Sequence, residues 1–297
     1  MGKLKHLYIG VIFVLTVAGN SYAETIRTVN FEEGTVGSIG NLSYLTVSGN
    51  APQIVTAQNG VIPRSGQYMM RTYLNRETSS TNFRTEATLN SPGTFEKGKE
   101  YWFSISIYLP KDWSLDYGTK QSDGIVWQFH DRAYKDPENW RQILPLTVMH
   151  RESGWVIINH TYANSVNKGR SLGNLKTFSK TVPYKLGQWT DFVMNVKFSG
   201  AESPDDTNGF FKVWVDGQLV LDIAGQNYFG EQQGPYFKFG LYNSAWKYVD
   251  TWAGTSSRLL YHDELRIGDA NSSFNDISPP GTVTIYPPSP PTILVAQ

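Results

Sequence analysis

The sequence predicts an all-β fold of two packed antiparallel sheets, either a sandwich or a jelly roll, and three observations lead to this prediction. Short runs of alternating apolar and polar residues recur along the chain, with Gly, Pro, Asn or Asp between them. The chain shows no convincing long amphipathic helix. About 250 residues are left once the two ends are set aside, which suits one large β domain with its own core. Many short strands in a domain of this size are typical of two-sheet folds.

The clearest strand signals, in chain order, are Thr28–Phe31, Tyr68–Tyr73, Phe83–Leu89, Tyr101–Leu109, Ile125–His130, Leu144–His150, Trp155–Tyr162, Thr190–Phe198, Phe210–Val215, Gln218–Ile223, Tyr236–Tyr242 and Leu259–Ile267. Asp216-Gly217 separates two of these runs and predicts a two-residue hairpin turn, because both residues tolerate a positive φ.

Both ends of the chain differ from this pattern and are left out of the predicted fold. Residues 1–23 start with two lysines, continue with an apolar run over 7–17 and end in small residues up to Ala23, which is typical of a secretory signal peptide. We therefore expect a secreted or periplasmic protein with a β domain over 24–277. From Ser278 onward the chain is rich in proline, so 278–297 is predicted to be an extended tail or linker.

Composition argues against several classes of function. Lys+Arg and Asp+Glu are equal at 26 each, which disfavours a nucleic-acid binder that works by counterion release. After the signal no apolar run of roughly 20 residues follows, so we expect no membrane span in the mature chain. The absence of cysteine fits a bacterial periplasmic or secreted enzyme better than a small disulfide-stapled domain. The content of 9 Trp and 17 Tyr is common in secreted β proteins that handle carbohydrate, although most such rings fill the core.

Three of the predicted strands carry reactive side chains on the face opposite an apolar row. Side chains at i and i+2 of a strand share a face. The polar faces of 82–89, 125–130 and 236–242 carry, in turn, Arg84 and Glu86, Gln128 and His130, and Tyr236, Lys238 and Tyr242. A merely solvated face shows Thr, Ser, Lys and Glu more often than this mixture. If the three strands lie in one sheet, their polar rows form one floor with a base, cations, an amide and phenols.

These segments resemble the three signature blocks of the β-jelly-roll polysaccharide lyases. Arg84-Thr-Glu86, Gln128-Phe-His130 and YFKFGLYN over 236–243 match blocks that read R-[ST]-E-L, Q-[IV]-H and Y-F-K-x-G-x-Y-N in alginate lyases of that fold. One departure is Ala87, where the alginate pattern has Leu.

The ending LLYHDELRIGD over 259–269 is closer to the heparin lyase and glucuronan lyase relatives, and the resemblance runs from about Thr28 to Asp269. It implies a concanavalin-like β-jelly roll of two antiparallel sheets with a concave substrate cleft.

The resemblance implies a polysaccharide lyase that cleaves a 1,4-linked uronate chain by β-elimination. In this reaction the C5 proton is removed and the 4-O-linked sugar departs, which leaves a 4,5-unsaturated uronate. The site must neutralise or hydrogen-bond the carboxylate as charge develops on it. A base and an acid must also transfer protons. No cofactor is required for these steps, and glucuronan, alginate and heparin-like polymers all stay open as substrates.

Four residues suit these catalytic roles. Gln128 can donate its amide to the carboxylate, and Arg84 can pair with the same carboxylate bidentately. His130 has an ordinary pKa near 6.5 and can serve as the base. Tyr242 can donate to the glycosidic oxygen, or act as the base itself beside a cation. The resemblance implies that His130 and Tyr242 share the two proton transfers, and which of them is the base stays open.

Other residues are candidates for binding the polymer. Glu86 is expected to pair with Arg84 and fix its orientation, and Lys238 is expected either to act on Tyr242 or to hold a neighbouring uronate. Candidate stacking, positioning or loop residues around the site are Tyr236, Asn243, Trp246, Trp252, either His160 or Asn159, and Arg132 in the loop 131–142.

The remaining histidines and one acidic residue are given structural roles. His150 is expected at a strand end, and His262 on the surface. Asp263 falls on the apparent core side of 259–267, where a carboxylate needs a partner. It can hold a structural Ca²⁺ with Glu32 or Glu33, as relatives of this fold do, or accept backbone hydrogen bonds. No EF-hand loop is present, so no metal site is assigned.

Two rival functions remain for the same fold. A jelly-roll glycoside hydrolase needs two carboxylates about 5–5.5 Å apart if it retains configuration, and no single strand offers such a pair. A non-catalytic, lectin-like carbohydrate-binding module keeps stacking aromatics but has no use for converging Gln, His, Arg and Tyr. We expect a monomer whose partner is an anionic polysaccharide.

Overall fold

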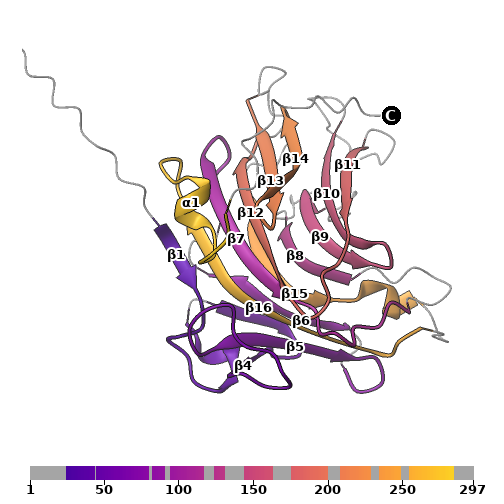
Figure 1. Ribbon diagram of the computed structural model, residues 1–297. Helices are drawn as coiled ribbons and strands as arrows, with labels where there is room; N and C mark the ends of the chain where they lie inside the picture. Colours follow the sequence, from indigo (N-terminus) through magenta and orange to yellow (C-terminus); the bar gives the residue numbers. More distant parts are fainter. Residues whose placement is uncertain are drawn as a thin grey trace, which may run out of the picture.

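The computed structural model describes residues 25–43, 45–79, 82–90, 94–116, 124–130, 144–162, 175–199, 208–228, 234–248 and 254–283. These ranges form strands β1 to β16, arranged in two antiparallel sheets (Figure 1). The strands are β1 Thr25–Val29, β2 Gly37–Ser38, β3 Leu45–Gly49, β4 Gln53–Val55, β5 Met69–Asn75, β6 Arg84–Leu89, β7 Glu100–Tyr108, β8 Gly124–His130, β9 Leu146–Arg151, β10 Gly154–Tyr162, β11 Leu175–Val182, β12 Trp189–Lys197, β13 Phe210–Val215, β14 Gln218–Ala224, β15 Tyr236–Tyr242 and β16 Ser257–Gly268. The two-sheet prediction is confirmed.

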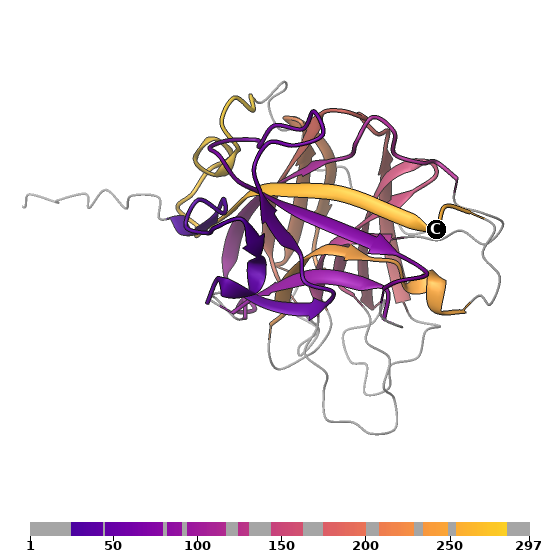
Figure 2. The same ribbon diagram turned by 90° about the horizontal axis from the view of Figure 1, so that it is seen from below.

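The sheets differ in size and in strand order. The nine-stranded sheet runs β14-β13-β12-β7-β16-β5-β4-β2, with β1 paired to β16, and the seven-stranded sheet runs β11-β10-β9-β8-β15-β6-β3. Neighbours in space are therefore often distant in sequence, as Figure 1 shows for β6, β8 and β15. The last strand, β16, crosses the middle of the nine-stranded sheet (Figure 2).

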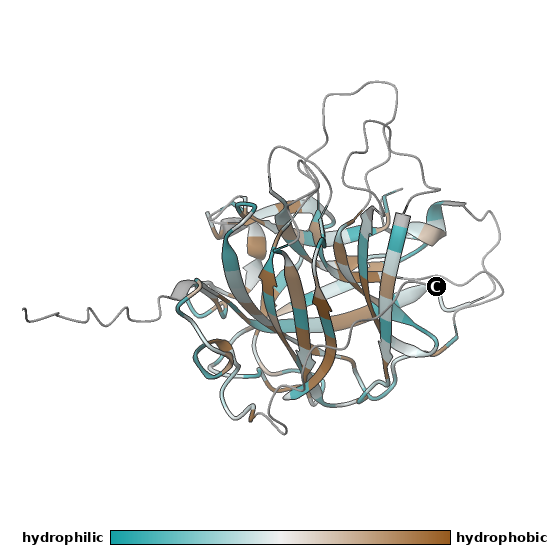
Figure 3. Cartoon of the chain, turned by 90° about the horizontal axis from the view of Figure 1, so that it is seen from above, coloured by the Kyte–Doolittle hydropathy of each residue, from teal (hydrophilic) through white to brown (hydrophobic). Residues whose placement is uncertain are grey.

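The hydrophobic core lies between the two sheets. Phe103 of β7 faces Phe129 of β8 and Phe237 of β15, with ring centroids 4.9 and 5.8 Å apart. Burial of one such ring stabilises the fold by about 1.5–3 kcal/mol. Hydrophobic and hydrophilic bands alternate along the strands of both sheets (Figure 3), so each sheet has one core face and one outer face.

The hairpin between β13 and β14 forms as the sequence predicts. Asp216 and Gly217 both take positive φ angles, 48° and 81°, which is the backbone of a tight two-residue turn. Four further strands, β2, β3, β4 and β11, were not among the predicted runs. They are short or lie towards sheet edges, where one-sided burial leaves a weaker alternation of residue types.

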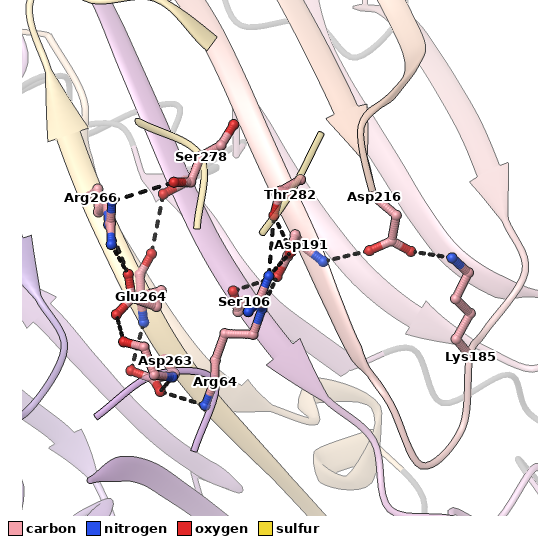
Figure 4. Close-up of polar contacts among 12 residues, drawn as sticks. Arg64, Ser106, Lys185, Asp191, Asp216, Asp263, Glu264, Arg266, Ser278 and Thr282 are labelled. Atoms are coloured by element: carbon pink, nitrogen blue, oxygen red, sulfur yellow. Dashed lines mark hydrogen bonds and ion pairs between the residues drawn. The ribbon is translucent and has the colours of Figure 1, made fainter. Parts of the chain in front are cut away.

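The outer face of the nine-stranded sheet is tied to a loop by an ion pair and to the C-terminal segment by hydrogen bonds (Figure 4). Arg64 Nη2 lies 2.8 Å from Asp191 Oδ2 of β12, and Thr282 donates to the same carboxylate. Arg266 of β16 donates to the Ser278 carbonyl at 3.4 Å. The first residues of the expected tail, up to Thr282, therefore contact the domain.

A bulge in β16 corrects two expectations. The register shifts between Asp263 and Arg266, and Glu264 has a φ of 52°. His262 was expected on the surface, but it is fully buried, lies between the sheets and donates from Nε2 to the Val126 carbonyl at 3.2 Å. Its neighbour Tyr261 packs instead in a smaller cluster on the outer face of this sheet. The expected alternation is therefore wrong by one residue before the bulge, at Leu259 and Tyr261, and right after it, where Leu265 and Ile267 lie in the main core.

The described helices are short and few. They are η1 Ile39–Asn41, η3 Ser244–Tyr248 and α1 Phe274–Ile277. Among the described residues, no helix is long and apolar enough to cross a membrane. The η3 turn follows β15 directly and becomes part of the site described below.

Candidate active site

Strands β6, β15 and β8 are neighbours in the seven-stranded sheet, so the three polar rows lie side by side. The cross-strand register pairs Tyr236 with His130 and Lys238 with Gln128. On the other side of β15, Tyr242 pairs with Arg84. Paired residues point to the same face of a sheet, so these side chains share the outer face, away from the core.

Glu86 is the centre of this cluster. Its Oε1 accepts a hydrogen bond from Gln128 Nε2 at 2.5 Å. Its Oε2 lies 2.9 Å from both Lys238 Nζ and Arg84 Nε. The carboxylate is only 1% exposed, so each of these partners offsets the cost of burying its charge. The expected pairing of Glu86 with Arg84 is present.

Lys238 does not take the position expected of a residue that holds a neighbouring uronate. Its side chain is only 4% exposed and contacts Glu86, so it does not reach out to a neighbouring sugar. Burial lowers its pKa, while the Glu86 carboxylate opposes that change. The ammonium also interacts electrostatically with Tyr242, which was the other expected role.

Tyr242 is flanked by two cations. The Arg84 guanidinium lies over its ring, with Cζ 4.1 Å from the ring centroid. Lys247, in the η3 turn, donates from Nζ to the phenol oxygen at 3.3 Å. Lys247 was not among the expected site residues, because an exposed lysine five residues after a strand residue looks like any solvated lysine.

His130 lies at the other end of the same row. Its ring stacks on Tyr236, with centroids 5.0 Å apart and an interplanar angle of 26°. The Gln128–Lys238 pair comes between His130 and Tyr242 along the two strands. An imidazole and a phenol therefore approach the Glu86 cluster from its two ends.

Two irregularities shape the central strands. The register of β8 shifts between Ile125 and Trp127, so that Val126 joins the main core whereas Ile125 does not. Strict alternation from Trp127 and Phe129 predicts Ile125 on the core face, and the bulge reverses this. In β15, Gly240 takes a φ of 138°, and a Cβ there would lie 2.2 Å from the Thr85 carbonyl oxygen. This position therefore requires glycine.

Of the two candidates in β10, His160 faces the site and Asn159 does not. His160 Nδ1 lies 3.0 Å from Thr177 Oγ1 on the outer face, and burial lowers the pKa of its imidazole. Asn159 is fully buried and donates to the carbonyls of Pro145 and Asn227. His160 is two strands away from β8, so it belongs to the flank of the site.

Two candidates for sugar contact are buried instead. Trp246 is 1% exposed and packs edge-on against Phe83, so its ring is not available for stacking on a sugar. Asn243 is fully buried, and its Oδ1 lies 3.1 Å from Nε2 of His150. His150 was expected at a strand end and is found near the end of β9, fully buried. Arg132 and Trp252 lie outside the described residues.

Asp263 is engaged by the backbone, one of the two alternatives that the sequence left open. Its Oδ2 accepts from the N–H groups of Arg64 and Ser65 at 2.9 and 3.3 Å, and its Oδ1 accepts from the Glu264 N–H at 2.8 Å. Burial raises the pKa of Asp263 to about 8, and these donors oppose that rise. The part of the chain that the structure describes contains no group of three or more acidic, His or Cys side chains suited to a metal.

The arrangement suits an anionic ligand that reacts by proton transfer. Arg84, Lys238 and Lys247 supply three cations against the single Glu86 carboxylate. Buried hydrogen bonds hold the centre rigid, which is how catalytic sites keep their donors preorganised. The imidazole of His130 and the phenol of Tyr242 are both half-buried and so remain accessible to a ligand.

Comparison with known proteins agrees with this geometry. A family model described as polysaccharide lyase matches residues 31–266. No curated protein sequence matches the chain. Among solved structures, an endo-β-1,4-glucuronan lyase from the fungus Trichoderma reesei is similar, with a TM-score of 0.66 and 18% identity over 86% of this chain and 99% of that chain.

A second similar structure is the alginate lyase Aly36B, with a TM-score of 0.50 and 13% identity over 81% of this chain and 95% of that chain. A double mutant of that enzyme, solved in complex with an alginate tetrasaccharide, gives the same TM-score of 0.50. At these identities the likenesses show the fold, a jelly roll of two antiparallel sheets.

Proposed function

The chain belongs to the polysaccharide lyase family, and from this we propose that it cleaves a 1,4-linked polysaccharide containing uronic acid by β-elimination. The observation that carries the proposal is the pairing of β6, β15 and β8, which sets Arg84 and Gln128 on one buried carboxylate and His130 and Tyr242 on the same outer face of the sheet.

β-Elimination needs donors that stabilise the charge on the sugar carboxylate, and it needs two groups that transfer protons. The bond between C5 and its proton breaks, the C4–O bond breaks, and a double bond forms between C4 and C5. Negative charge develops on the sugar carboxylate while the C5 proton leaves. Donors aimed at that charge are worth about 3 kcal/mol each.

Arg84 is the group that receives the sugar carboxylate. Its side chain is 27% exposed, and Glu86 holds only one edge of the guanidinium, through Nε. The remaining N–H groups can pair with a carboxylate. Gln128 lies beneath, 1% exposed, and can keep one amide N–H on Glu86 while it donates the second to the substrate. The surplus of positive charge offsets the charge of the uronate.

His130 and Tyr242 divide the two proton transfers. A sugar seated over Gln128 has the imidazole at one end and the phenol at the other. One group takes the C5 proton, and the other gives a proton to the departing glycosidic oxygen. The cations Arg84 and Lys247 beside the phenol stabilise negative charge on its oxygen whenever the proton is shared or transferred.

A glycoside hydrolase is the weaker reading of the same site. Glu86 is the only carboxylate in β6, β8 and β15, and three partners hold it. A retaining hydrolase needs two carboxyl groups about 5–5.5 Å apart across the bond. Asp263 and Glu264 lie in the nine-stranded sheet, away from this face. We therefore propose elimination and not hydrolysis, with a 1,4-linked uronate polymer such as glucuronan, alginate or a heparin-like chain as the substrate.

We also propose that the protein acts outside the cytoplasm. The support is the signal-like segment 1–23, with its basic start and apolar run.

A panel of purified uronate polymers tests the function. A lyase leaves 4,5-unsaturated ends that absorb in the near ultraviolet. Hydrolysis gives new reducing ends without that chromophore, and a lectin gives neither. A rise in absorbance with glucuronan, alginate or another 1,4-linked uronate polymer supports the proposal, and new ends without absorbance overturn it.

A further inference from the structure

We propose that His150 is a positioning residue for the elimination, and that it acts through Asn243 to hold Tyr242 and Arg84 in register. This inference rests on the proposed function of Tyr242 and Arg84. Neither His150 nor Asn243 faces the substrate, because both are fully buried beneath the site.

Asn243 is bonded in three directions. It directly follows Tyr242, the last residue of β15. Its N–H donates to the Phe83 carbonyl at 3.0 Å, and its own carbonyl accepts from the Trp246 N–H at 3.2 Å. Its side-chain Oδ1 lies 3.1 Å from His150 Nε2. One residue thus joins the end of β15 to three separate parts of the chain.

The two backbone bonds reach both sides of the site. Phe83 immediately precedes Arg84 and has a φ of 44°, a strained conformation for a residue with a side chain. Its bond to Asn243 therefore fixes the point at which β6 starts. Trp246 immediately precedes Lys247, which donates to the Tyr242 phenol. A shift of Asn243 would move Arg84, Tyr242 and Lys247 relative to one another.

The bond from His150 is the one that sets the position of the Asn243 side chain. The imidazole is fully buried, with the Trp113 ring edge-on at a centroid distance of 5.1 Å. Burial, together with the charge of Arg258, lowers the pKa of His150 to about 3, so the ring is neutral at working pH. An amide oxygen only accepts hydrogen bonds, so the imidazole proton lies on Nε2 and points at Asn243.

Gly124 closes the remaining space around this bond. A Cβ at this position would lie 1.8 Å from His150 Nε2 and 2.2 Å from Asn243 Oδ1. Contacts this short force one of the two side chains to move. Gly124 is also the first residue of β8, the strand that carries Gln128 and His130. The His150–Asn243 pair therefore lies beside the first residue of β8. Asn243 also directly follows β15 and is bonded to Phe83, the residue before β6.

The experiment perturbs the bond in three independent ways on whichever polymer the wild-type enzyme cleaves. His150→Leu removes the donor, Asn243→Leu removes the acceptor, and Gly124→Ala pushes the two side chains apart. Each is expected to lower kcat by about 10- to 100-fold with little change in KM, because a misplaced phenol or guanidinium affects the reacting state more than binding. His150→Gln keeps an N–H donor near the Nε2 position and is expected to recover most of the lost kcat.

A matched control separates positioning from loss of stability. Asn227 is also fully buried, donates to the carbonyls of Lys197 and Phe210, and accepts from the Ser199 N–H. Asn227→Ala is expected to lower the melting temperature but to keep kcat close to that of the wild type. The inference is overturned if His150→Leu, folded by circular dichroism, retains wild-type kcat, or if His150→Gln is as slow as His150→Leu. If instead the wild type cleaves no uronate polymer, it is the proposed function that fails.

Discussion

The guanidinium of Arg84 lies over the ring of Tyr242, with Cζ 4.1 Å from the ring centroid. The same group is held through Nε by Glu86 at 2.9 Å. Arg84 therefore orients the phenol on one side and offers its free edge to a ligand on the other. In the reaction we propose, this relationship couples carboxylate recognition to proton transfer. It arises because β6 and β15 pair with Tyr242 opposite Arg84.

Arg84→Lys tests the recognition half of this coupling. The substitution keeps the charge but loses the planar, bidentate fork. We expect kcat/KM to fall by about 100-fold, the usual effect of removing one well-placed donor to a developing anion. Initial rates from the near-ultraviolet chromophore give this value. A fall of less than about threefold would show that Arg84 does not contact the reacting carboxylate.

Tyr242→Phe and His130→Ala test the two proton transfers. Each variant removes one group while leaving the buried cluster around Glu86 in place. We expect turnover to disappear in both, with circular dichroism spectra and melting temperatures near those of the wild type, because neither side chain is fully buried. Near-normal rates in both variants would refute the assignment of roles.

Lys247→Met tests a cation that the sequence did not reveal. The methionine retains an unbranched side chain but loses the donor that reaches the Tyr242 oxygen. We expect about a tenfold loss in kcat, in line with the weaker donors of catalytic sites. Lys180→Met, on exposed edge strand β11 of the same sheet, is the control and is expected to be silent. Equal rates for the two variants would remove Lys247 from the mechanism.

Glu86→Gln tests the buried centre. Removing this charge leaves the ammonium of Lys238, which is 4% exposed, without its carboxylate. Breaking one partner of a buried pair costs about 3–5 kcal/mol, so we expect a loss of this size in the free energy of unfolding measured with urea. The double variant Glu86→Gln, Lys238→Met removes both charges and is expected to recover most of the loss. A double variant no more stable than Glu86→Gln would show that the pair is not the source.

Much of this site could be predicted from the sequence because strand alternation fixes which side chains share a face. Arg84 and Glu86, Gln128, and Lys238 and Tyr242 all lie on the outer face of one sheet, as the period of two implies. The two-sheet fold followed from the same pattern, and the turn at Asp216-Gly217 from its local chemistry.

What could not be predicted depends on bulges and on burial. A bulge inserts one residue and exchanges the faces beyond it, which is why Ile125 and His262 were assigned to the wrong sides. Burial is a property of the assembled sheets, so the sequence did not show that Trp246, Asn243 and Lys238 are covered. Lys247 reaches Tyr242 only through the η3 turn, and no periodic pattern marks that turn.

The most direct test of the central claim compares two quantities in one digestion. Purified protein is incubated with a 1,4-linked uronate polymer, and the unsaturated chromophore and the new reducing ends are counted together. Elimination at the cluster of Arg84, Gln128, His130 and Tyr242 predicts one chromophore for every new reducing end, with both signals lost in Tyr242→Phe. New reducing ends that accumulate without the chromophore would contradict it.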